Sequence, residues 1–474
     1  MDTPVNRSRI ESVWHQIGLA RALRPSTLWS RLQDGYGRLM RPASTVYHAA
    51  PVPPTKHGRR PQVLHMARGR TRSRARPFGL EVMEPRLLLS ADVSALGVLQ
   101  VVGTENDDEV VLTRTLTGLD VTIGGNLAGS FLSSSYQSIE IDALGGQDAI
   151  RFEGDIDLAN HALSAQGEEI TVAGSIMGAS SVTLTARSDT LATITVQGDI
   201  QASGAVQLSA QSGATETITS FTSHAATSIA TVSITGAGTT VQGETLDITA
   251  HNRAVITALF DAAAFTQSNL LITQDNTTAV SVGDGVTLDG ASGVIVESLD
   301  DSWVQIELDS TGIDVSGGIE IELDFALLSS HVVLTRSTTV ALDEGSTAVS
   351  DGLVALSARN DLAARADVAP EDLFSVSNRV LGGLVGQARN TVTDVAEASV
   401  TGATVNAALS VLASNAGVYT ALGRVASNTL DGNTLATIAA ESAITASGSV
   451  SVAAIDSAHL TAEATPVLLD AQMV

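Results

Sequence analysis

The sequence predicts an all-β protein, a right-handed parallel β-helix (β-solenoid) preceded by a basic, mostly disordered leader. Three observations support this prediction. Apolar and polar residues alternate in many short segments after residue 92, which is the period of a strand with one buried face. Aromatic residues make up only 3% of the chain and cysteine is absent, so Val, Ile, Leu and Ala must fill the core. A short segment also recurs, which is typical of repeat architectures.

The recurring segment describes a strand, a corner and a second strand of one coil. Residues 200–210 (IQASGAVQLSA) recur closely as residues 444–454 (ITASGSVSVAA). Looser copies end at Ala186, Ala250, Ala358 and Ala413, at irregular spacings, so we expect missing copies or inserted loops. Residues 161–474 are therefore predicted to be solenoid repeats. With about 20 to 25 residues per coil, the array would hold roughly 15 to 20 coils and measure on the order of 80 Å.

Handedness and one ambiguous segment complete the fold prediction. Crossovers between parallel strands are right-handed in nearly all proteins, which gives the expected hand. Residues 391–428 are rich enough in Ala for a helix, but frequent Thr, Val and Ser and three interrupting glycines favour strands.

Residues 1–80 form the leader. Of the 26 Lys and Arg residues, 16 lie at or before residue 90, together with only 5 of the 51 Asp and Glu residues. The stretch up to residue 90 also holds 9 of the 11 prolines, so it cannot support a packed core. A weak helical pattern with Arg between its apolar residues leaves binding to a membrane surface or a partner as the alternative to disorder.

The composition changes sharply at residues 81–92. This segment contains the run Glu84, Pro85, Arg86, Leu87, Leu88, Leu89, Ser90, Ala91 and Asp92. It resembles the LEPR-XLL motif, found near the N-terminus of very large bacterial extracellular repeat proteins after a basic segment. Met83 stands where that family has its first Leu. The resemblance implies a targeting motif and an extracellular or cell-surface location.

Residues 93–160 read as an N-terminal β-repeat region. Short strands end in Gly, Asn and Asp turns, such as 105–109 (ENDDE) and 145–150 (GGQDAI). The second turn resembles half of a hemolysin-type repeat, whose family binds calcium between neighbouring turns. The resemblance implies calcium ligands at Asp107, Asp108 and Asp148. Ala143 and Leu144 replace the leading glycine pair of that family, which puts the site in doubt.

A second acidic feature lies in two alternating segments, 304–309 (VQIELD) and 319–325 (IEIELDF). If the two strands were neighbours, their carboxylates would repel one another unless they shared a cation such as calcium. The alternative is a purely structural role, in which these carboxylates form a solvated polar face that protects the sheet from aggregation. The candidate ligands are Glu307, Asp309, Glu320, Glu322 and Asp324.

The residues available for catalysis are few. After residue 90 the chain has no Lys and five His residues that lie far apart in sequence. Asp300 and Asp301 form the one carboxylate pair near a tryptophan, Trp303, that could stack on a sugar. We therefore expect no enzyme, and keep a β-helical glycan-active enzyme, a polysaccharide lyase or hydrolase, as the alternative.

The sequence as a whole favours a structural, adhesin-like repeat scaffold, secreted or on the cell surface, with a surface glycan or protein as its ligand. The formal net charge of −25 argues against nucleic acid as a partner. No run of about 18 apolar residues is present, so we expect no transmembrane segment. Because no capping element follows the copy at 444–454, we expect a truncated N-terminal piece of a larger protein that self-associates through an open solenoid end.

Overall fold

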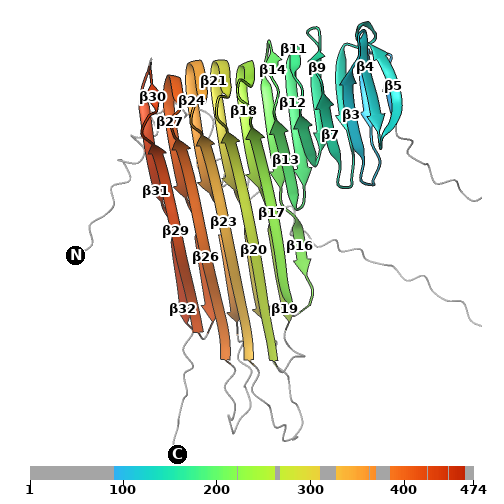
Figure 1. Cartoon of the computed structure of the whole chain (residues 1–474). Helices are drawn as coiled ribbons and strands as arrows, with labels where there is room; N and C mark the ends of the chain where they lie inside the picture. Colours follow the sequence, from blue (N-terminus) through green and yellow to red (C-terminus); the bar gives the residue numbers. More distant parts are fainter. Residues whose placement is uncertain are drawn as a thin grey trace, which may run out of the picture. The chain divides into compact units, whose positions relative to one another are not determined.

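A computed structural model describes residues 90–220, 222–261, 267–309, 327–361, 363–369, 385–423, 425–446 and 448–464. It confirms the solenoid: strands of successive coils stack side by side along one axis (Figure 1). Most strand pairs are parallel and in register. Among the described residues, no helix is long and apolar enough to cross a membrane. The predicted leader, residues 1–80, lies outside the described residues.

Three sheets form the walls of the solenoid. The first follows the path β1 (Ser90–Val93), β2 (Val98–Val102), β6 (Ser138–Asp142), β9 (Ala162–Gly167), β12 (Ser181–Ser188), β15 (Val206–Ser212), β18 (Thr240–Asn252), β21 (Thr287–Asp300), β24 (Thr347–Asn360), β27 (Thr404–Asn415) and β30 (Ala443–Ile444). Four more of its strands lie off this path: β8 (Ile156–Asp157), β11 (Ile176–Ala179), β14 (Ile200–Ala202) and β31 (Val450–Asp456).

The second sheet faces the first. It contains, in order, β29 (Val425–Ile438), β26 (Val385–Val400), β23 (Leu327–Leu342), β20 (Gln267–Val282), β17 (Ser223–Ile234), β13 (Leu191–Val196), β10 (Glu169–Val172), β7 (Ala149–Glu153), β3 (Glu109–Arg114), β4 (Gly118–Ile123) and β5 (Asn126–Leu132). A single 3-10 turn, η1 (Ser133–Ser135), follows β5 in the described chain. The third sheet contains β16 (Thr215–Ile218), β19 (Val255–Asp261), β22 (Trp303–Asp309), β25 (Ala363–Ala369), β28 (Val418–Gly423) and β32 (His459–Ala464).

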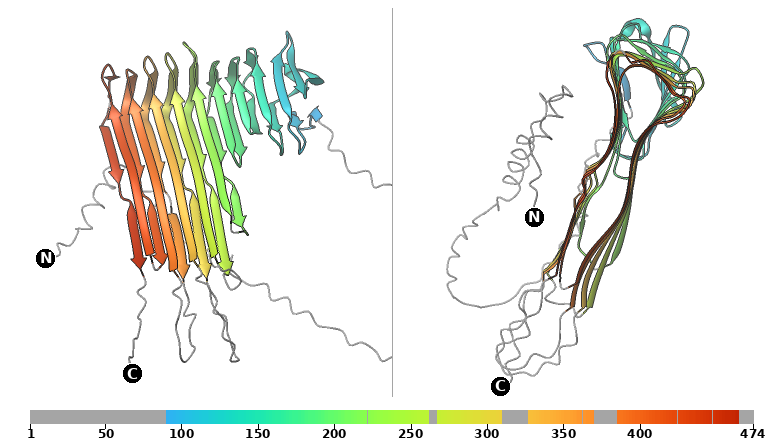
Figure 2. Two further views of the ribbon diagram at one scale, coloured as in Figure 1. Left: turned by 60° about the horizontal axis from the view of Figure 1, so that its bottom comes forward. Right: turned by 90° about the vertical axis from the view of Figure 1, so that its left-hand side faces the viewer.

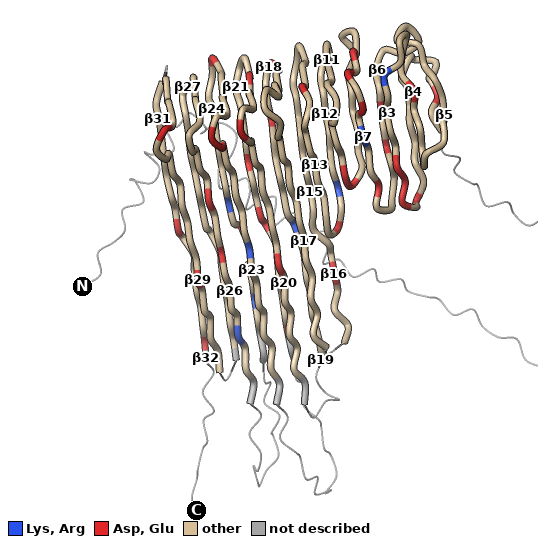
Figure 3. The backbone as a smooth tube through the Cα atoms, in the orientation of Figure 1, with Lys and Arg blue, Asp and Glu red and all other residues tan. Residues whose placement is uncertain are grey.

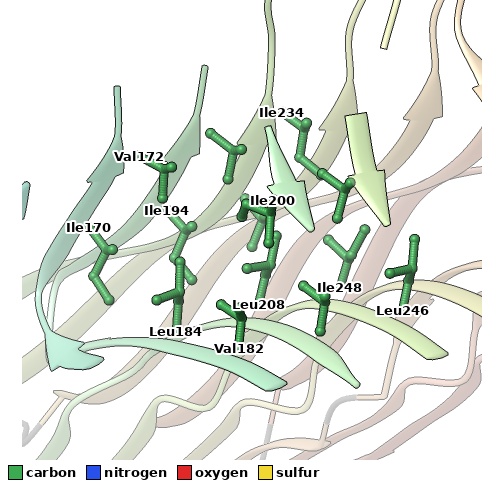
Figure 4. Close-up of a cluster of buried hydrophobic side chains, with 14 of the residues drawn as sticks. Ile170, Val172, Val182, Leu184, Ile194, Ile200, Leu208, Ile234, Leu246 and Ile248 are labelled. Carbon is green, nitrogen blue, oxygen red and sulfur yellow. The ribbon is translucent and has the colours of Figure 1, made fainter. Parts of the chain in front are cut away.

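The walls enclose two compartments, each with its own apolar core. The upper compartment, built from the first sheet and the facing portion of the second, runs through all coils and contains Val182, Leu208 and Ile248 (Figure 4). The lower compartment begins only at β16 and lies between the third sheet and the long strands of the second. Viewed along the axis, the upper compartment is a ring, and the lower compartment consists of facing layers of strands (Figure 2).

The core arises because the period-two pattern places like residues above one another. Val182, Val206, Leu246, Val294 and Val354 occupy one register position in five successive strands. All five are fully or almost fully buried. Each such side chain contributes about 1.5–3 kcal/mol by leaving water, so a column of them stabilises every added coil.

The alanines that end the predicted repeat form another column. Ala186, Ala210, Ala250, Ala358, Ala413 and Ala454 share one register position, which confirms that the repeat copies are equivalent coils. The gap between Ala250 and Ala358 is filled by Ser298, a copy that the sequence pattern did not reveal. The segment 391–428 is built of strands, as predicted.

The predicted size of the stack is wrong. The register partners Ile150, Ile170 and Ile194 define short coils close to the expected length, but Val280 and Val340 are 60 residues apart in equivalent positions. The later coils are longer because each also builds a level of the lower compartment. The path from β2 to β30 therefore holds ten strands among the described residues, which at about 4.8 Å each span on the order of 45 Å.

The two ends of the stack differ. At the N-terminal end, β1 pairs antiparallel with β2, and β3, β4 and β5 form an antiparallel meander. At the other end, β31 and β32 pair among the described strands only with β27 and β28. Val450 and Val452 on β31 are 47% and 45% exposed. Self-association through this edge stays a prediction.

Stacked glycines allow neighbouring coils to approach closely at one corner. A Cβ on Gly174 would lie 2.1 Å from the carbonyl oxygen of Gly154, and one on Gly198 would lie 2.3 Å from that of Gly174. We expect Gly174→Ala to lower the free energy of unfolding by about 1–3 kcal/mol, because two backbones must separate. Gly432→Ala is the control, since its Cβ would meet nothing nearer than 3.7 Å. Urea unfolding of both variants checks this, and equal stabilities would contradict it.

Candidate functional site

The carboxylates predicted to bind calcium near the N-terminus lie in stacked turns and hold neighbouring coils together. Asp107 Oδ1 accepts a hydrogen bond from the Gln147 N–H at 2.9 Å. Asp148 Oδ1 accepts from the Asp108 N–H, and Glu168 Oε2 accepts from the Asp148 N–H, both at 2.8 Å. Within the described ranges, no three His, Asp or Glu side chains are placed to hold a metal ion. The Asp107 and Asp148 oxygens join neighbouring coils, whereas Asp108 Oδ2 accepts within its own turn, from the Thr104 N–H and hydroxyl. Calcium binding by these residues stays a prediction.

Asp148 is the unusual member of this turn ladder. It is 1% exposed, and its Oδ2 has no hydrogen-bond partner among the described residues. Its pKa is raised to about 7, mainly because burial disfavours the charged form. The hydrogen bond from the Asp108 N–H lowers the pKa, and the nearby Glu168 carboxylate raises it further. The fold therefore favours the protonated form of Asp148 more than water does.

The second acidic feature is only partly described. Glu307 and Asp309 lie on β22, whose whole length pairs with β19 on one side and β25 on the other. Both neighbours of β22 are therefore strands other than the segment 319–325, which the sequence suggested as its partner. Glu320, Glu322 and Asp324 lie outside the described residues. Glu307 is exposed and stands opposite Leu259 and Asp367 in the sheet.

The LEPR-XLL-like motif is described only at its end. Ser90, Ala91 and Asp92 belong to β1, where they pair with Val102, Val101 and Gln100. The residues from Glu84 to Leu89 lie outside the described ranges. The structure therefore places the end of the motif at the first strand of the solenoid.

Asp300 and Asp301 do not act as a carboxylate pair. Asp300 closes β21 with its side chain inward and is fully buried, whereas Asp301 lies outside the core, 2.8 Å from His251 Nε2. Trp303 begins β22 and is 37% exposed. Asp301, His251 and Trp303 therefore face outward, whereas Asp300 faces the interior, because side chains alternate between the two faces of a strand.

A buried polar layer separates the two compartments, and sequence reasoning missed it. On the first sheet, the positions two residues after the alanine column carry Ser212, Asn252, Asp300, Asn360 and Asn415. On the second sheet, Ser228, Asn276, Arg336 and Asp394 share the facing register position. We call these nine residues the polar seam. A polar residue that recurs at an inward position was the available signal.

The neutral members of the polar seam satisfy one another across the interior. The Ser228 hydroxyl donates to Asn252 Oδ1 at 3.0 Å, and the Asn276 amide donates to Asp300 Oδ2 at 2.9 Å. Asn360 and Asn415 instead pair along the stack: the Asn360 amide donates to Oδ1 of Asn415, its register neighbour in the first sheet, at 2.8 Å. Such bonds are needed because an unpaired polar group in an apolar interior costs about 1–3 kcal/mol.

The charged members form one network around Arg336, which is 1% exposed. Its Nε and Nη2 donate to the two oxygens of Asp394 at 2.8 and 2.6 Å, and Nη2 also donates to the Tyr419 hydroxyl at 2.9 Å. Tyr419 in turn donates to Asp394. Burial lowers the pKa of Arg336, but Asp394 and Asp300 raise it by more, so the guanidinium stays charged.

Asp300 supplies a second carboxylate to this network. Burial raises its pKa, while Arg336 and the hydrogen bonds from Ser302 and Asn276 lower it. Burial has the larger effect, so the pKa stays above the usual aspartate range. One buried guanidinium thus faces two buried carboxylates, and only the one on Asp394 is bonded to it in the bidentate geometry.

A pocket opens on the outer surface where the lower compartment begins. Its volume is about 760 Å³, and its lining runs from the turns at Gly146 and Glu168 to Thr215 on β16 and Val255 on β19. We call it the step pocket. Its lining includes Gln147, Glu168, Arg187, Asp189, Gln211, His251 and Arg253. Figure 3 shows acidic residues spread over many turns of the solenoid and few basic ones.

Stability should depend on pH through Asp148. Its folded-state pKa is raised to about 7, so the protonated form favours the fold, and this contribution is lost as the pH rises from about 4 through 7. In Asp148→Asn a neutral amide replaces the protonated acid. We therefore expect the variant to lose less unfolding free energy than the unmodified protein between pH 5 and pH 8, with a difference of at least about 1 kcal/mol. Urea unfolding at both pH values checks this, and parallel pH profiles would contradict it.

Removing Arg336 should destabilise the lower compartment. Arg336→Met leaves Asp394 buried without its partner, which we expect to cost about 3–5 kcal/mol. Adding Asp394→Asn should recover some of the loss, because it removes the unpaired charge. Arg359→Met is the control, since Arg359 forms half-exposed ion pairs with Glu297 and Asp361 and should cost less than about 1 kcal/mol. Chemical unfolding of the four proteins measures these differences, and equal costs for Arg336 and Arg359 would refute the assignment.

No protein-family model matches this chain, and neither a curated protein nor a solved structure matches it. The geometry alone therefore has to indicate the function.

Proposed function

We propose that the chain is a non-catalytic, adhesin-like structural scaffold that is secreted or displayed on a cell surface. The observation that carries this proposal is the unbroken register of the long strands. β20, β23 and β26 are each 16 residues long and pair with one another along their whole length. Stacking of this kind gives a stiff body in which each coil is stabilised by its neighbours.

Surface chemistry supports the same role. The net charge of −25 keeps a large, flat-sided body soluble and discourages edge-to-edge contact. Outward strand positions carry Thr, Ser, Asp and Gln, such as Thr183, Gln207 and Asp247 in one column. Over these three strands the polar column presents a repeating surface to a ligand, and exposed Ile295 continues it on β21.

Antibody labelling of cells that make the protein tests this function. We expect intact cells, or their medium, to carry the label, and loss of the protein to reduce attachment of the cells to surfaces. Label that appears only after permeabilisation, together with unchanged attachment, would contradict the proposal.

A glycan-active enzyme is the second candidate, favoured by the pair of His251 and Asp301. Their 2.8 Å contact joins a base to a carboxylate, both about one third exposed, on the outer surface that Trp303 shares. Incubation with polysaccharides and measurement of new reducing ends or unsaturated products separates the two functions. The scaffold predicts no product, whereas product that disappears in His251→Ala and Asp301→Asn would establish the enzyme.

A further inference from the structure

The step pocket has walls that both donate and accept hydrogen bonds. Guanidinium and amide donors come from Arg187, Arg253, Gln147 and Gln211, and carboxylate acceptors from Glu168 and Asp189. Hydroxyls of Ser188, Thr190 and Thr215 can do either, and Val255 is the one branched apolar side chain in the lining. A ligand that fits must therefore be polar over most of its surface, with groups that donate and accept.

Two guanidiniums in this pocket are available to a ligand. Arg187 and Arg253 are exposed, and neither lies within ion-pair distance of a carboxylate among the described residues. Arg187 Nε donates to Gln211 Oε1 at 3.0 Å, which fixes the direction of the guanidinium and leaves its outer N–H groups unused. Planar N–H forks of this kind bind pairs of oxygens.

The charges around the pocket argue against a polyanion. Glu168 and Asp189 balance the two arginines within the lining, and the chain as a whole carries −25. A highly charged anionic ligand would therefore be repelled at long range. The combination of donors, acceptors and no net local charge matches the hydroxyl groups of a neutral sugar.

The pocket is also periodic. Arg187, Gln211 and His251 occupy one register position in β12, β15 and β18. Successive strands lie about 4.8 Å apart, which is comparable to the length of one sugar ring in an extended chain. Trp303 stands next to Val255 in the third sheet and continues this surface with an exposed ring on which a sugar can stack.

From these four observations we propose that the step pocket binds a neutral, linear oligosaccharide that lies along the solenoid axis, with about one sugar unit per coil. The scaffold role requires no such site, so this inference goes beyond it. An extended peptide is the competing occupant, since β16 is the edge strand of its sheet. A peptide needs apolar pockets for its side chains, whereas Val255 is the one branched apolar side chain in the lining.

Isothermal titration calorimetry with the full chain tests this. The probes are neutral hexasaccharides of β-1,4-linked glucose, xylose and mannose and β-1,3-linked glucose, their disaccharides, and hexagalacturonate as the charged comparison. We expect at least one neutral hexasaccharide to bind, about tenfold or more tighter than its disaccharide, because each coil adds contacts. The binding should change little between low and high salt.

Variants locate the site. Arg253→Ala and Gln211→Ala should each weaken the neutral hexasaccharide by about tenfold, the loss of one hydrogen-bonding group. Arg151→Ala is the matched control, since Arg151 is exposed on β7 and paired with Glu153. Unchanged far-UV spectra and melting temperatures show that the variants fold.

Three outcomes would overturn the inference. The first is that no neutral hexasaccharide binds. The second is that a neutral hexasaccharide binds the pocket variants as tightly as the unmodified protein. The third is that only hexagalacturonate binds, with strong salt dependence. An extended peptide that binds, and is lost with the pocket variants, would replace the sugar as the occupant. Each of these results leaves the surface-display experiment unaffected, so the two proposals fail independently.

Discussion

Every level of this structure depends on one constraint, the in-register stacking of parallel strands. A parallel ladder fixes each residue above its equivalent in the previous coil, so any side chain must fit its own column as well as its neighbours. Valine and leucine columns fill the upper compartment, glycine columns let backbones approach at a corner, and carboxylates in the turns receive N–H groups from the next coil. The same constraint aligns Arg187, Gln211 and His251 at the step pocket.

The polar seam shows why this register is defined so narrowly. A shift of one coil by one residue would point Asn276 and Arg336 outward and bring apolar neighbours into the seam. A shift by two residues would keep the faces but break the bidentate pair of Arg336 and Asp394. Buried polar groups that find partners in only one arrangement disfavour the others, because each unpaired group costs free energy.

The sequence predicted the features of this fold that depend on local pattern. Alternation identified the strands, and the branched–turn–alanine segment identified equivalent coils, including Ala186, Ala210 and Ala250. Coil length could not be predicted, because the lower compartment is built from segments of ordinary alternating sequence that carry no sign of their sheet. One coil was not recognised because Ser298 replaces the alanine at its end, so the gap between Ala250 and Ala358 was interpreted as a long insertion or a missing copy.

The functional residues were harder to assign for a physical reason. Asp300 and Asp301 are neighbours in sequence, yet alternation sends one into the seam and leaves the other with His251 outside. Partners in the seam and the step pocket are 16 to 60 positions apart in sequence, so these sites appear only once the coils are stacked. Asp108 and Asp148 were predicted as calcium ligands, and this stays a prediction. In the structure Asp108 Oδ2 accepts from the Thr104 N–H and hydroxyl, and Asp148 Oδ1 accepts from the Asp108 N–H.

Cysteine cross-linking at the seam tests the central claim most directly, because the chain has no cysteine of its own. Asp275 and Thr335 are exposed register partners beside Asn276 and Arg336, and adjacent parallel strands lie about 4.8 Å apart, within reach of a disulfide. Asp275→Cys with Thr335→Cys should form an intramolecular disulfide on mild oxidation, detected by mass spectrometry after digestion. Asp275→Cys with Ser337→Cys, shifted by two residues, should not. Efficient cross-linking of the shifted pair and none of the first would contradict the stacking described.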